Sequence, residues 1–235
     1  MSIFIKMSFL LDEISRHPLF QCRMFPVVGK RKNFFITLGL PGVGKTTFCE
    51  LLRASCPPGT VKVINRDEIR AGIIWELRKL SPEAQQAEKD EIDDRVTERV
   101  INRISEILHD EPSISVIILD GCHTYFPCLY SILEAIHGAG GMLNIPFAIH
   151  LCMIGSPLSN SVHKLSDKKK NDYSDYQAGG YHSSVPKEVF KLKRIQYFNL
   201  ICQETFQKVT ELCDYVYVLP NYDPKDKEST ACKSQ

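Results

Sequence analysis

The segment from Gly39 to Thr46 constrains the fold of this chain more than any other. It reads G-L-P-G-V-G-K-T and matches the phosphate-binding loop pattern G-x-x-x-x-G-K-[ST] at every fixed position. Its glycines let the backbone bend so that successive N–H groups point at phosphate oxygens. Lys45 would place a positive charge beside the β- and γ-phosphates, and the Thr46 hydroxyl would bind Mg²⁺. The sequence therefore predicts a site for a nucleoside triphosphate.

The residues on both sides of this segment support the same prediction. Residues 33–38 form an apolar run that predicts a buried strand, and residues 47–53 predict the first turns of a helix. The N-terminus of such a helix adds a favourable field for an anion. The predicted nucleotide-binding residues are Gly39, Leu40, Pro41, Gly42, Val43, Gly44, Lys45, Thr46 and Thr47.

Composition indicates a soluble, cytoplasmic globular protein. The 235 residues are 43% hydrophobic and 24% charged, which suits one domain with a sizeable core. A net charge of +1 excludes a general electrostatic attraction to nucleic acid or membrane, so any such attraction must come from local patches. No apolar stretch is long enough to span a bilayer. The apolar opening at residues 1–11 is interrupted by Lys6, which is poor signal-peptide form and favours a helix that packs on the domain.

The cysteines indicate reduced thiols rather than a disulfide framework or a zinc site. Nine cysteines occur, an odd number, and none are spaced as C-x-x-C. Cys122, Cys152 and Cys202 lie in apolar runs, so we expect buried, unpaired thiols.

Apolar strand-like runs alternate with helical patterns along the chain. The predicted strands are residues 33–38, 60–65, 114–119, 147–154 and 214–219. Continuous apolar strands of this length favour a parallel sheet covered on both faces, which implies a three-layer α/β fold. A long helix is expected after Ser81-Pro82-Glu83, and another from Pro186 to Leu212. We expect an N-terminal extension at 1–32, a domain at 33–220 with a polar lid at about 163–185, and a flexible tail at 221–235.

A second motif follows the second predicted strand, Ile64-Asn65-Arg66-Asp67-Glu68-Ile69-Arg70. Strand ends near a phosphate loop line the substrate crevice of a parallel sheet, and Arg70 lies about one helical turn after Asp67. A carboxylate beside a guanidinium suits transfer to an alcohol, with Asp67 orienting the hydroxyl and Arg70 holding an anionic group of the acceptor. The alternative is that Asp67 caps the next helix and Arg70 makes a surface ion pair.

These motifs together resemble the polynucleotide 5′-hydroxyl kinase group of P-loop kinases, whose relatives include zeta-toxin-type kinases and kinases of seryl-tRNA. The resemblance implies a P-loop NTPase fold with a five-stranded parallel sheet, helices on both faces and a lid. It also implies that Asp67 is the general base toward a 5′-hydroxyl and that Arg70 contacts a phosphate of the nucleic acid. Asp120, in Leu119-Asp120-Gly121-Cys122-His123, matches the acidic strand end that supports the metal site.

The lid differs from the pattern of this family. Family lids usually carry an arginine that clamps the phosphates, but this chain has no arginine between Arg103 and Arg194. The available cations are Lys164, Lys168, Lys169 and Lys170, and we assign Lys168 a catalytic role among them. Lysine is a point charge without bidentate reach, so its clamp would be less directional. The alternative is that these lysines belong to a solvated loop.

We therefore expect an enzyme that uses ATP and Mg²⁺ to phosphorylate a hydroxyl of a nucleic acid 5′ end or a nucleotide-like acceptor. Lys45, Asp67, Arg70 and Lys168 would be catalytic, and Thr46 and Asp120 would support the metal. One alternative keeps the fold and changes the acceptor to seryl-tRNA, a sugar nucleotide or a small metabolite. The other is a regulatory module that binds ATP without transferring phosphate. The sequence does not determine whether the nucleotide is ATP or GTP. It also leaves open the oligomeric state and the role of residues 1–32.

Overall fold

The computed structural model describes residues 31–77, 91–155 and 187–219. These residues form one parallel sheet of five strands in the order β2-β3-β1-β4-β5. The strands are β1 (Lys32–Leu38), β2 (Val61–Asn65), β3 (Val116–Asp120), β4 (Phe147–Ile154) and β5 (Tyr215–Leu219). All five lie within a residue or two of the predicted runs, and the predicted α/β sheet is confirmed.

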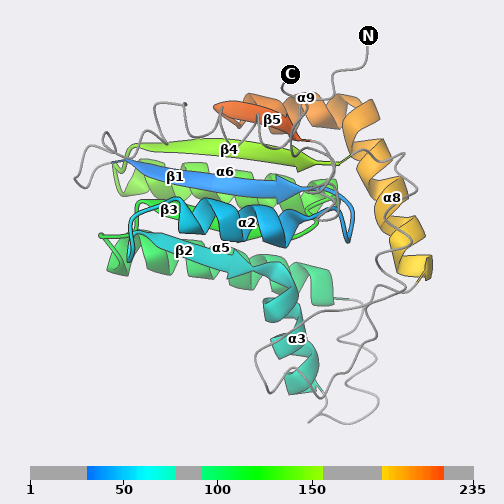
Figure 1. Cartoon of the computed structure of the whole chain (residues 1–235), viewed down its shortest axis with the longest axis horizontal. Coiled ribbons are helices and arrows are strands. Elements are labelled where there is room, and N and C mark those ends of the chain that lie inside the picture. Colours follow the sequence, from blue (N-terminus) through cyan, green and yellow to red (C-terminus); the bar gives the residue numbers. More distant parts are fainter. Residues whose placement is uncertain (1–30, 78–90, 156–186, 220–235) are drawn as a thin grey trace, which may run out of the picture.

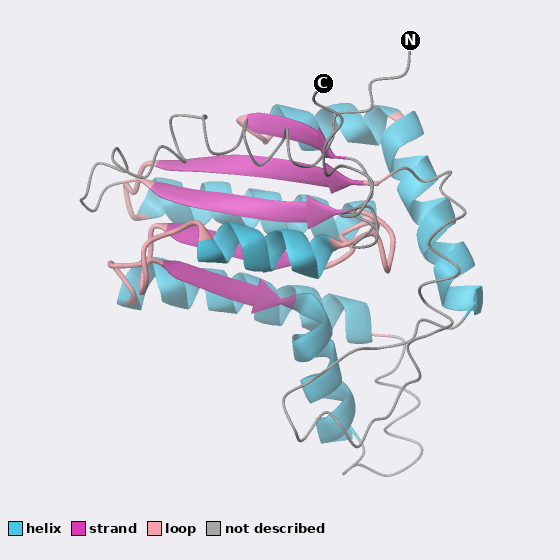
Figure 2. Ribbon diagram, viewed as in Figure 1, coloured by secondary structure: helices cyan, strands magenta, loops and turns pink. Residues whose placement is uncertain are grey.

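Helices cover both faces of this sheet, as Figures 1 and 2 show. The described helices are α2 (Lys45–Ala54), α3 (Arg66–Leu77), α5 (Ile92–Asp110), α6 (Phe126–Met142), α8 (Lys187–Cys202) and α9 (Glu204–Glu211). Helix α2 lies on one face, and α5 and α6 lie side by side on the other, so the molecule has three layers.

The core lies between these layers because the central strands are apolar on both faces. Every residue of β1 and β3 is buried, as expected for strands with a helix layer on each side. Val100, Ile104 and Ile107 of α5 recur at helical spacing and are buried against the sheet. The sheet is therefore a rigid platform whose carboxyl ends hold the loops described below.

One predicted helix is wrong in its extent. The apolar pattern predicted a single helix over 186–212, whereas α8 ends at Cys202 and α9 begins at Glu204. Gln203 is extended, with φ −112° and ψ 164°, so the helical hydrogen bonds are interrupted there. The break changes the direction of the chain (Figure 1), and Phe206 and Val209 then pack on the core.

Helix α6 was not predicted at all. It is apolar around most of its surface and contains Gly138, Gly140 and Gly141, so the sequence shows no clear polar face and its last turns have low helix propensity. For the preceding helix, the predicted start at Ser81-Pro82-Glu83 lies outside the described residues, and α5 is described from Ile92 onward.

The thiols agree with the prediction in their pairing and only partly in their burial. Free thiols in the described ranges include Cys49, Cys122, Cys128, Cys152, Cys202 and Cys213. Cys152 is buried, Cys122 is half-buried, and Cys202 is exposed at the end of α8, where the apolar run does not face the core.

Among the described helices, none is both long and apolar enough to cross a bilayer.

Candidate active site

The phosphate-loop segment connects the central strand β1 to helix α2, at the carboxyl edge of the sheet. Gly42 and Gly44 have φ values of 82° and 93°, in the left-handed region that glycine adopts without strain. Gly44 is the N-cap of α2 and has no side chain to occupy the first amide groups of that helix. The local geometry is therefore that of an anion-binding turn.

Two apolar residues of this segment are buried in the core. The side chains of Leu40 and Val43 are 0% and 2% exposed. Only their backbone groups could contact a nucleotide. Gly39 binds the segment to its neighbours, because its N–H donates to the Cys122 carbonyl at 3.1 Å. The loop is therefore fixed to the core before any ligand binds.

Lys45 lies across the loop in this structure. It is 7% exposed, and its Nζ donates to the Leu40 carbonyl oxygen at 2.6 Å. This hydrogen bond keeps the charged group within the turn. A phosphate oxygen in the turn would be a stronger acceptor than a neutral carbonyl, because a charge-assisted hydrogen bond is about twice as strong as a neutral one.

Asp120 connects three elements at this edge. Its Oδ2 accepts hydrogen bonds from Thr46 Oγ1 at 3.1 Å and from Asn65 Nδ2 at 3.2 Å. Burial raises the pKa of the Asp120 carboxyl; Lys45 and the Thr46 hydrogen bond oppose that shift, and the negative charge of Asp67 adds to it. Asn65 links this acid to the start of α3, because the side chain that donates to Asp120 also accepts the backbone N–H of Asp67 at 2.9 Å.

Asp67 is not the cap of the helix in which it lies. Asn65 Oδ1 accepts the backbone N–H groups of Asp67 at 2.9 Å and Glu68 at 3.1 Å, so Asn65 caps α3. The Asp67 side chain is exposed in the first turn of α3. The alternative role as a helix cap is therefore excluded by the hydrogen bonds, and the carboxylate of Asp67 faces solvent near the loop.

Arg70 makes an ion pair, as the alternative interpretation expected. Its Nη2 donates to Asp93 Oδ1 of α5. Arg66 Nη2 lies 3.7 Å from the same oxygen and donates to Thr97 Oγ1 at 3.2 Å. The Arg70 side chain is 30% exposed, so one side of the guanidinium stays open to solvent.

A buried histidine lies behind the phosphate loop. His123 has φ 46° and is 3% exposed, and its Nδ1 lies 2.8 Å from the Thr37 carbonyl oxygen. The Thr37 hydroxyl donates to the Gly121 carbonyl at 2.9 Å and accepts the Gly121 N–H at 3.1 Å. Burial, with the nearby charge of Arg66, lowers the pKa of His123 to about 3, so the imidazole is neutral.

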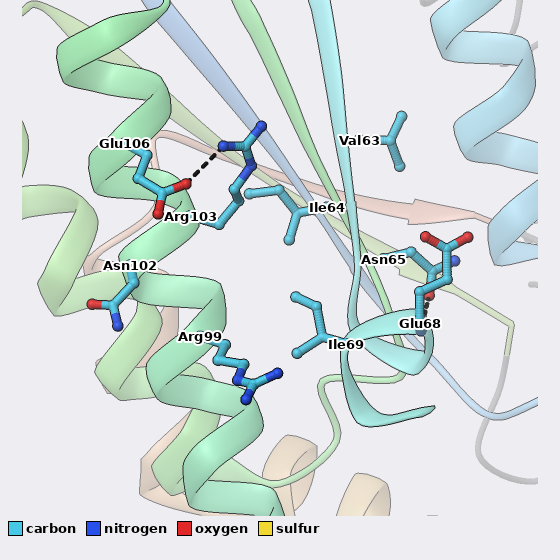
Figure 3. A pocket seen from close by; sticks show the side chains of 9 residues that line it. All are labelled: Val63, Ile64, Asn65, Glu68, Ile69, Arg99, Asn102, Arg103 and Glu106. Atoms are coloured by element: carbon cyan, nitrogen blue, oxygen red, sulfur yellow. Dashed lines mark hydrogen bonds and ion pairs between the residues drawn. The ribbon is translucent and has the colours of Figure 1, made fainter. Parts of the chain in front are cut away.

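A separate groove follows the free edge of β2, and Figure 3 shows its lining. Its volume is about 420 Å³. Arg99 and Arg103 of α5 project into it, but they pair with Glu76 at 2.5 Å and with Glu106 at 2.7 Å. The arginines of this groove are thus paired with carboxylates, which disfavours the groove as a site for phosphate.

The residues present fit Mg²⁺ and a nucleotide in their donor set. Within the described ranges, no three His, Cys, Asp or Glu side chains form a metal cluster. Mg²⁺ bound to nucleotides needs only one or two protein oxygens, since waters and phosphate oxygens complete its shell. Thr46 Oγ1 and Asp120 Oδ2, 3.1 Å apart, are two such oxygens beside the loop.

The structure thus brings together most of the predicted site residues at one edge of the sheet. Asp120 hydrogen-bonds Thr46, which follows Lys45 at the start of α2, and it also hydrogen-bonds Asn65, which caps α3 at Asp67. Arg70 lies one turn after Asp67. Lys168 and the whole predicted lid lie outside the described residues. Residues that the sequence did not single out are Asn65, Arg66, Asp93, Thr97 and His123. Asn65 and Arg66 lie inside the second motif and His123 lies inside the segment quoted around Asp120, whereas Asp93 and Thr97 had no signal in the sequence.

Comparisons with known proteins identify no relative in sequence. No family model matches the chain, and no curated protein matches it. Among solved structures, one similar chain is a protein provisionally described as a kinase from Chloroflexus aurantiacus, with 11% identity, a TM-score of 0.45, and coverage of 83% of this chain and 88% of that chain. Another is a fungal RNA kinase, with 13% identity, a TM-score of 0.44, and coverage of 83% and 78%. These similarities are too distant to assign a function.

Proposed function

We propose that this protein is a P-loop kinase that transfers the γ-phosphate of ATP to a hydroxyl of a nucleic acid 5′ end or a nucleotide-like acceptor. The observation that carries the proposal is the position of Asp67. Asp67 lies exposed in the first turn of α3, and the Asn65 side chain that accepts its N–H at 2.9 Å also donates to Asp120, beside the phosphate loop, at 3.2 Å. A pure nucleotide switch has no use for a second, solvent-facing carboxylate at this point.

Each residue has a defined part in the proposed reaction. ATP would supply the phosphoryl group, and Mg²⁺ held beside Thr46 and Asp120 would neutralise part of its charge. Lys45 moves its hydrogen bond from the Leu40 carbonyl to a phosphate oxygen. Asp67 accepts the proton of the acceptor hydroxyl as its oxygen forms the new bond to phosphorus, and the bond to the β-phosphate oxygen breaks to leave ADP. Asp120 holds Thr46 in place through the 3.1 Å hydrogen bond.

Asn65 positions the proposed base. Its side-chain oxygen Oδ1 accepts the backbone N–H groups of Asp67 and Glu68 at the start of α3, and its side-chain nitrogen Nδ2 donates to Asp120. One side chain therefore joins the helix that carries Asp67 to the strand end that carries Asp120. This connection fixes the distance between the two acids, which is the geometry on which transfer depends.

The proposal is tested by transfer from γ-labelled ATP to a panel of acceptors. The panel contains a 5′-hydroxyl oligonucleotide of RNA, one of DNA, seryl-tRNA, a sugar nucleotide and small alcohols. We expect labelling of the oligonucleotides. Labelling of small molecules alone would reject the nucleic-acid acceptor, and tight ATP binding without transfer to any acceptor would favour a regulatory module.

The Asp67→Asn variant tests the role of the carboxylate. We expect kcat to fall about 10²- to 10⁴-fold, the usual contribution of a general base, while ATP affinity measured by calorimetry is unchanged. The matched control is Glu68→Gln, which neutralises the adjacent exposed carboxylate and should retain activity. An equal loss of transfer and ATP binding in Asp67→Asn would show that Asp67 is structural.

A further inference from the structure

A row of stacked rings crosses three strands of the sheet. Phe35 of β1 is in register with His150 of β4, and His150 is in register with Tyr215 of β5. The His150 ring stacks between the other two, with its centroid 4.3 Å from that of Phe35 and 4.7 Å from that of Tyr215. Tyr217 lies on the same face of β5, and its hydroxyl is 3.3 Å from His150 Nδ1. These four residues are called the aromatic strip below.

Phe147 shows which face of the sheet carries the aromatic strip. A Cβ at Gly140 of α6 would overlap the Phe147 ring, so Phe147 points toward α6. His150 lies three residues later on β4, and successive side chains of a strand point to opposite faces, so His150 points away from α6. The strip therefore lies on the face that α2 occupies. Figure 1 shows α2 over the sheet between β1 and β2, whereas no described helix lies over β4 and β5 on this face.

The burial of His150 is greater than the stacked rings alone provide. A ring between two parallel rings has both of its faces covered, but its outer edge still points away from the sheet. His150 is nevertheless 0% exposed, whereas Tyr215 on the edge strand is 37% exposed. Because no described helix lies over β4 on this face, a cover from outside the described residues accounts for the burial of that edge.

The sequence indicates which part of the chain supplies this cover. The parts outside the described residues are 1–30, 78–90, 156–186 and 220–235. Only an apolar segment gains free energy by covering aromatic rings. The last three of these segments are largely polar, whereas residues 1–11 are rich in large apolar side chains, namely Ile3, Phe4, Ile5, Phe9, Leu10 and Leu11. Composition therefore selects the N-terminal run.

The connection of residues 1–30 to the sheet agrees with this choice. The segment leads directly into β1, which pairs with β4 from Lys32 to Leu38. It therefore joins the sheet beside the strand that carries His150. Neighbouring strands are about 4.8 Å apart and an extended residue spans about 3.3 Å, so residues 12–30 are long enough to place the run at 1–11 over β4 and β5.

We propose that the apolar run at residues 1–11 binds across the aromatic strip and, together with α2, completes the outer layer on this face of the sheet. The N-terminal extension is then an intramolecular partner of β4 and β5 and belongs to the folded domain. The contact is independent of the proposed reaction, so a failed transfer assay would leave it standing.

The test follows solvent access to the imidazole edge of His150 in the full chain, through exchange of its C2 proton for deuterium measured by mass spectrometry. In wild type we expect this exchange to be at least 10-fold slower than that of His109, whose side chain is 74% exposed. The double variant Phe4→Asp/Phe9→Asp should raise the rate at His150 at least 10-fold. The matched control is Ser2→Asp/Ser8→Asp, which adds the same two charges to the same run and should leave His150 slow.

His123 is the internal reference for global unfolding, because it is 3% exposed and lies behind the phosphate loop. It should stay slow in both double variants. If His150 stays slow in Phe4→Asp/Phe9→Asp, another segment covers the strip and the proposal is overturned. Protection of His150 that falls on dilution of wild type would place a second copy of the chain there and would also overturn it.

Nuclear Overhauser effects in wild type decide the question even if the phenylalanine variant unfolds. We expect contacts from the methyl groups of Ile3, Ile5, Leu10 or Leu11 to the ring protons of His150 or Tyr217. Methyl shifts of an unstructured chain, or contacts from these methyl groups only to other parts of the molecule, would refute the proposal.

Discussion

Single hydrogen bonds decide which acid near the phosphate loop is free to act. Asn65 takes the capping role at the start of α3, and this leaves the Asp67 carboxylate in solvent. Asp120 is buried and holds Thr46, so it is committed to the loop. The second motif contains both Asn65 and Asp67, and both residue types are good helix caps. The sequence could not choose between them, because the choice depends on where the helix begins in space.

His123 gives a prediction about acid stability at this scale. Burial, with the charge of Arg66, lowers its pKa to about 3 in the folded protein, against 6.5 for an ordinary histidine. Below pH 6.5 the unfolded chain gains a proton that the folded protein does not bind, so the free energy of unfolding falls as pH falls. One proton corresponds to about 1.4 kcal/mol per pH unit, or about 2 kcal/mol between pH 6.5 and pH 5.

Urea unfolding at pH 7 and pH 5 measures this effect. His123→Asn should be less stable than wild type at pH 7 but should lose about 2 kcal/mol less between the two pH values. His109→Asn is the control, since the His109 side chain is 74% exposed and should not alter the difference. An unchanged difference in His123→Asn would show that other groups set the acid sensitivity.

Helix α6 is stabilised by packing against neighbouring elements, although its glycines have low helix propensity. It contains three glycines near its C-terminus, and each lowers helix propensity by about 1 kcal/mol relative to alanine. Burial of Leu129, Ile132, Leu133 and Ile136 against the sheet compensates for this cost. The prediction missed α6 because its glycines obscure the helical pattern and because part of its stabilising contacts come from α5 and α9, elements separated from it in the chain.

The glycines of α6 give opposite predictions. A Cβ at Gly140 would overlap the Phe147 ring of β4, whereas a Cβ at Gly138 would meet nothing within 4 Å. We expect Gly140→Ala to destabilise the protein by about 1–3 kcal/mol through overpacking. We expect Gly138→Ala to stabilise it by about 0.5–1 kcal/mol through helix propensity.

Thermal or urea unfolding of the two variants, matched in chemistry and two residues apart, checks this pair. The difference in sign is the informative result, because both substitutions add the same methyl group to the same helix. Stabilisation by Gly140→Ala would mean that the Phe147 ring can move aside and that the contact between α6 and β4 is loose.

The sheet as a whole positions the site, because β1, β2 and β3 end at the same edge. Asn65 of β2 is in register with Asp120 of β3, and the phosphate loop follows β1 beside them. Ligands of open parallel sheets bind at such an edge. A nucleotide bound there contacts three strand ends at once, so binding should stabilise the entire fold rather than one loop.

This expectation gives a prediction for ATP and Mg²⁺. At a ligand concentration 100 times Kd, binding contributes about 2.7 kcal/mol, which corresponds to a rise in Tm of about 5–10 °C for a protein of this size. Lys45→Ala should lose this rise, and EDTA should reduce it for wild type. Lys62→Ala, which removes a surface lysine paired with Glu111, is the control and should keep it. A rise in Tm that persists in Lys45→Ala would place the nucleotide elsewhere.

The sequence by itself determined the features that depend on neighbours in the chain. The phosphate loop, the five strands and the motif around Asp67 could all be predicted, because turn geometry, apolar runs and motif spacing are local properties. Only the tertiary structure decided the partners of the charged groups. Arg70 meets Asp93 because α3 packs against α5, and no local pattern records which distant side chain fills a given position. Electrostatic partners follow distance in space, and packing of the whole molecule sets that distance.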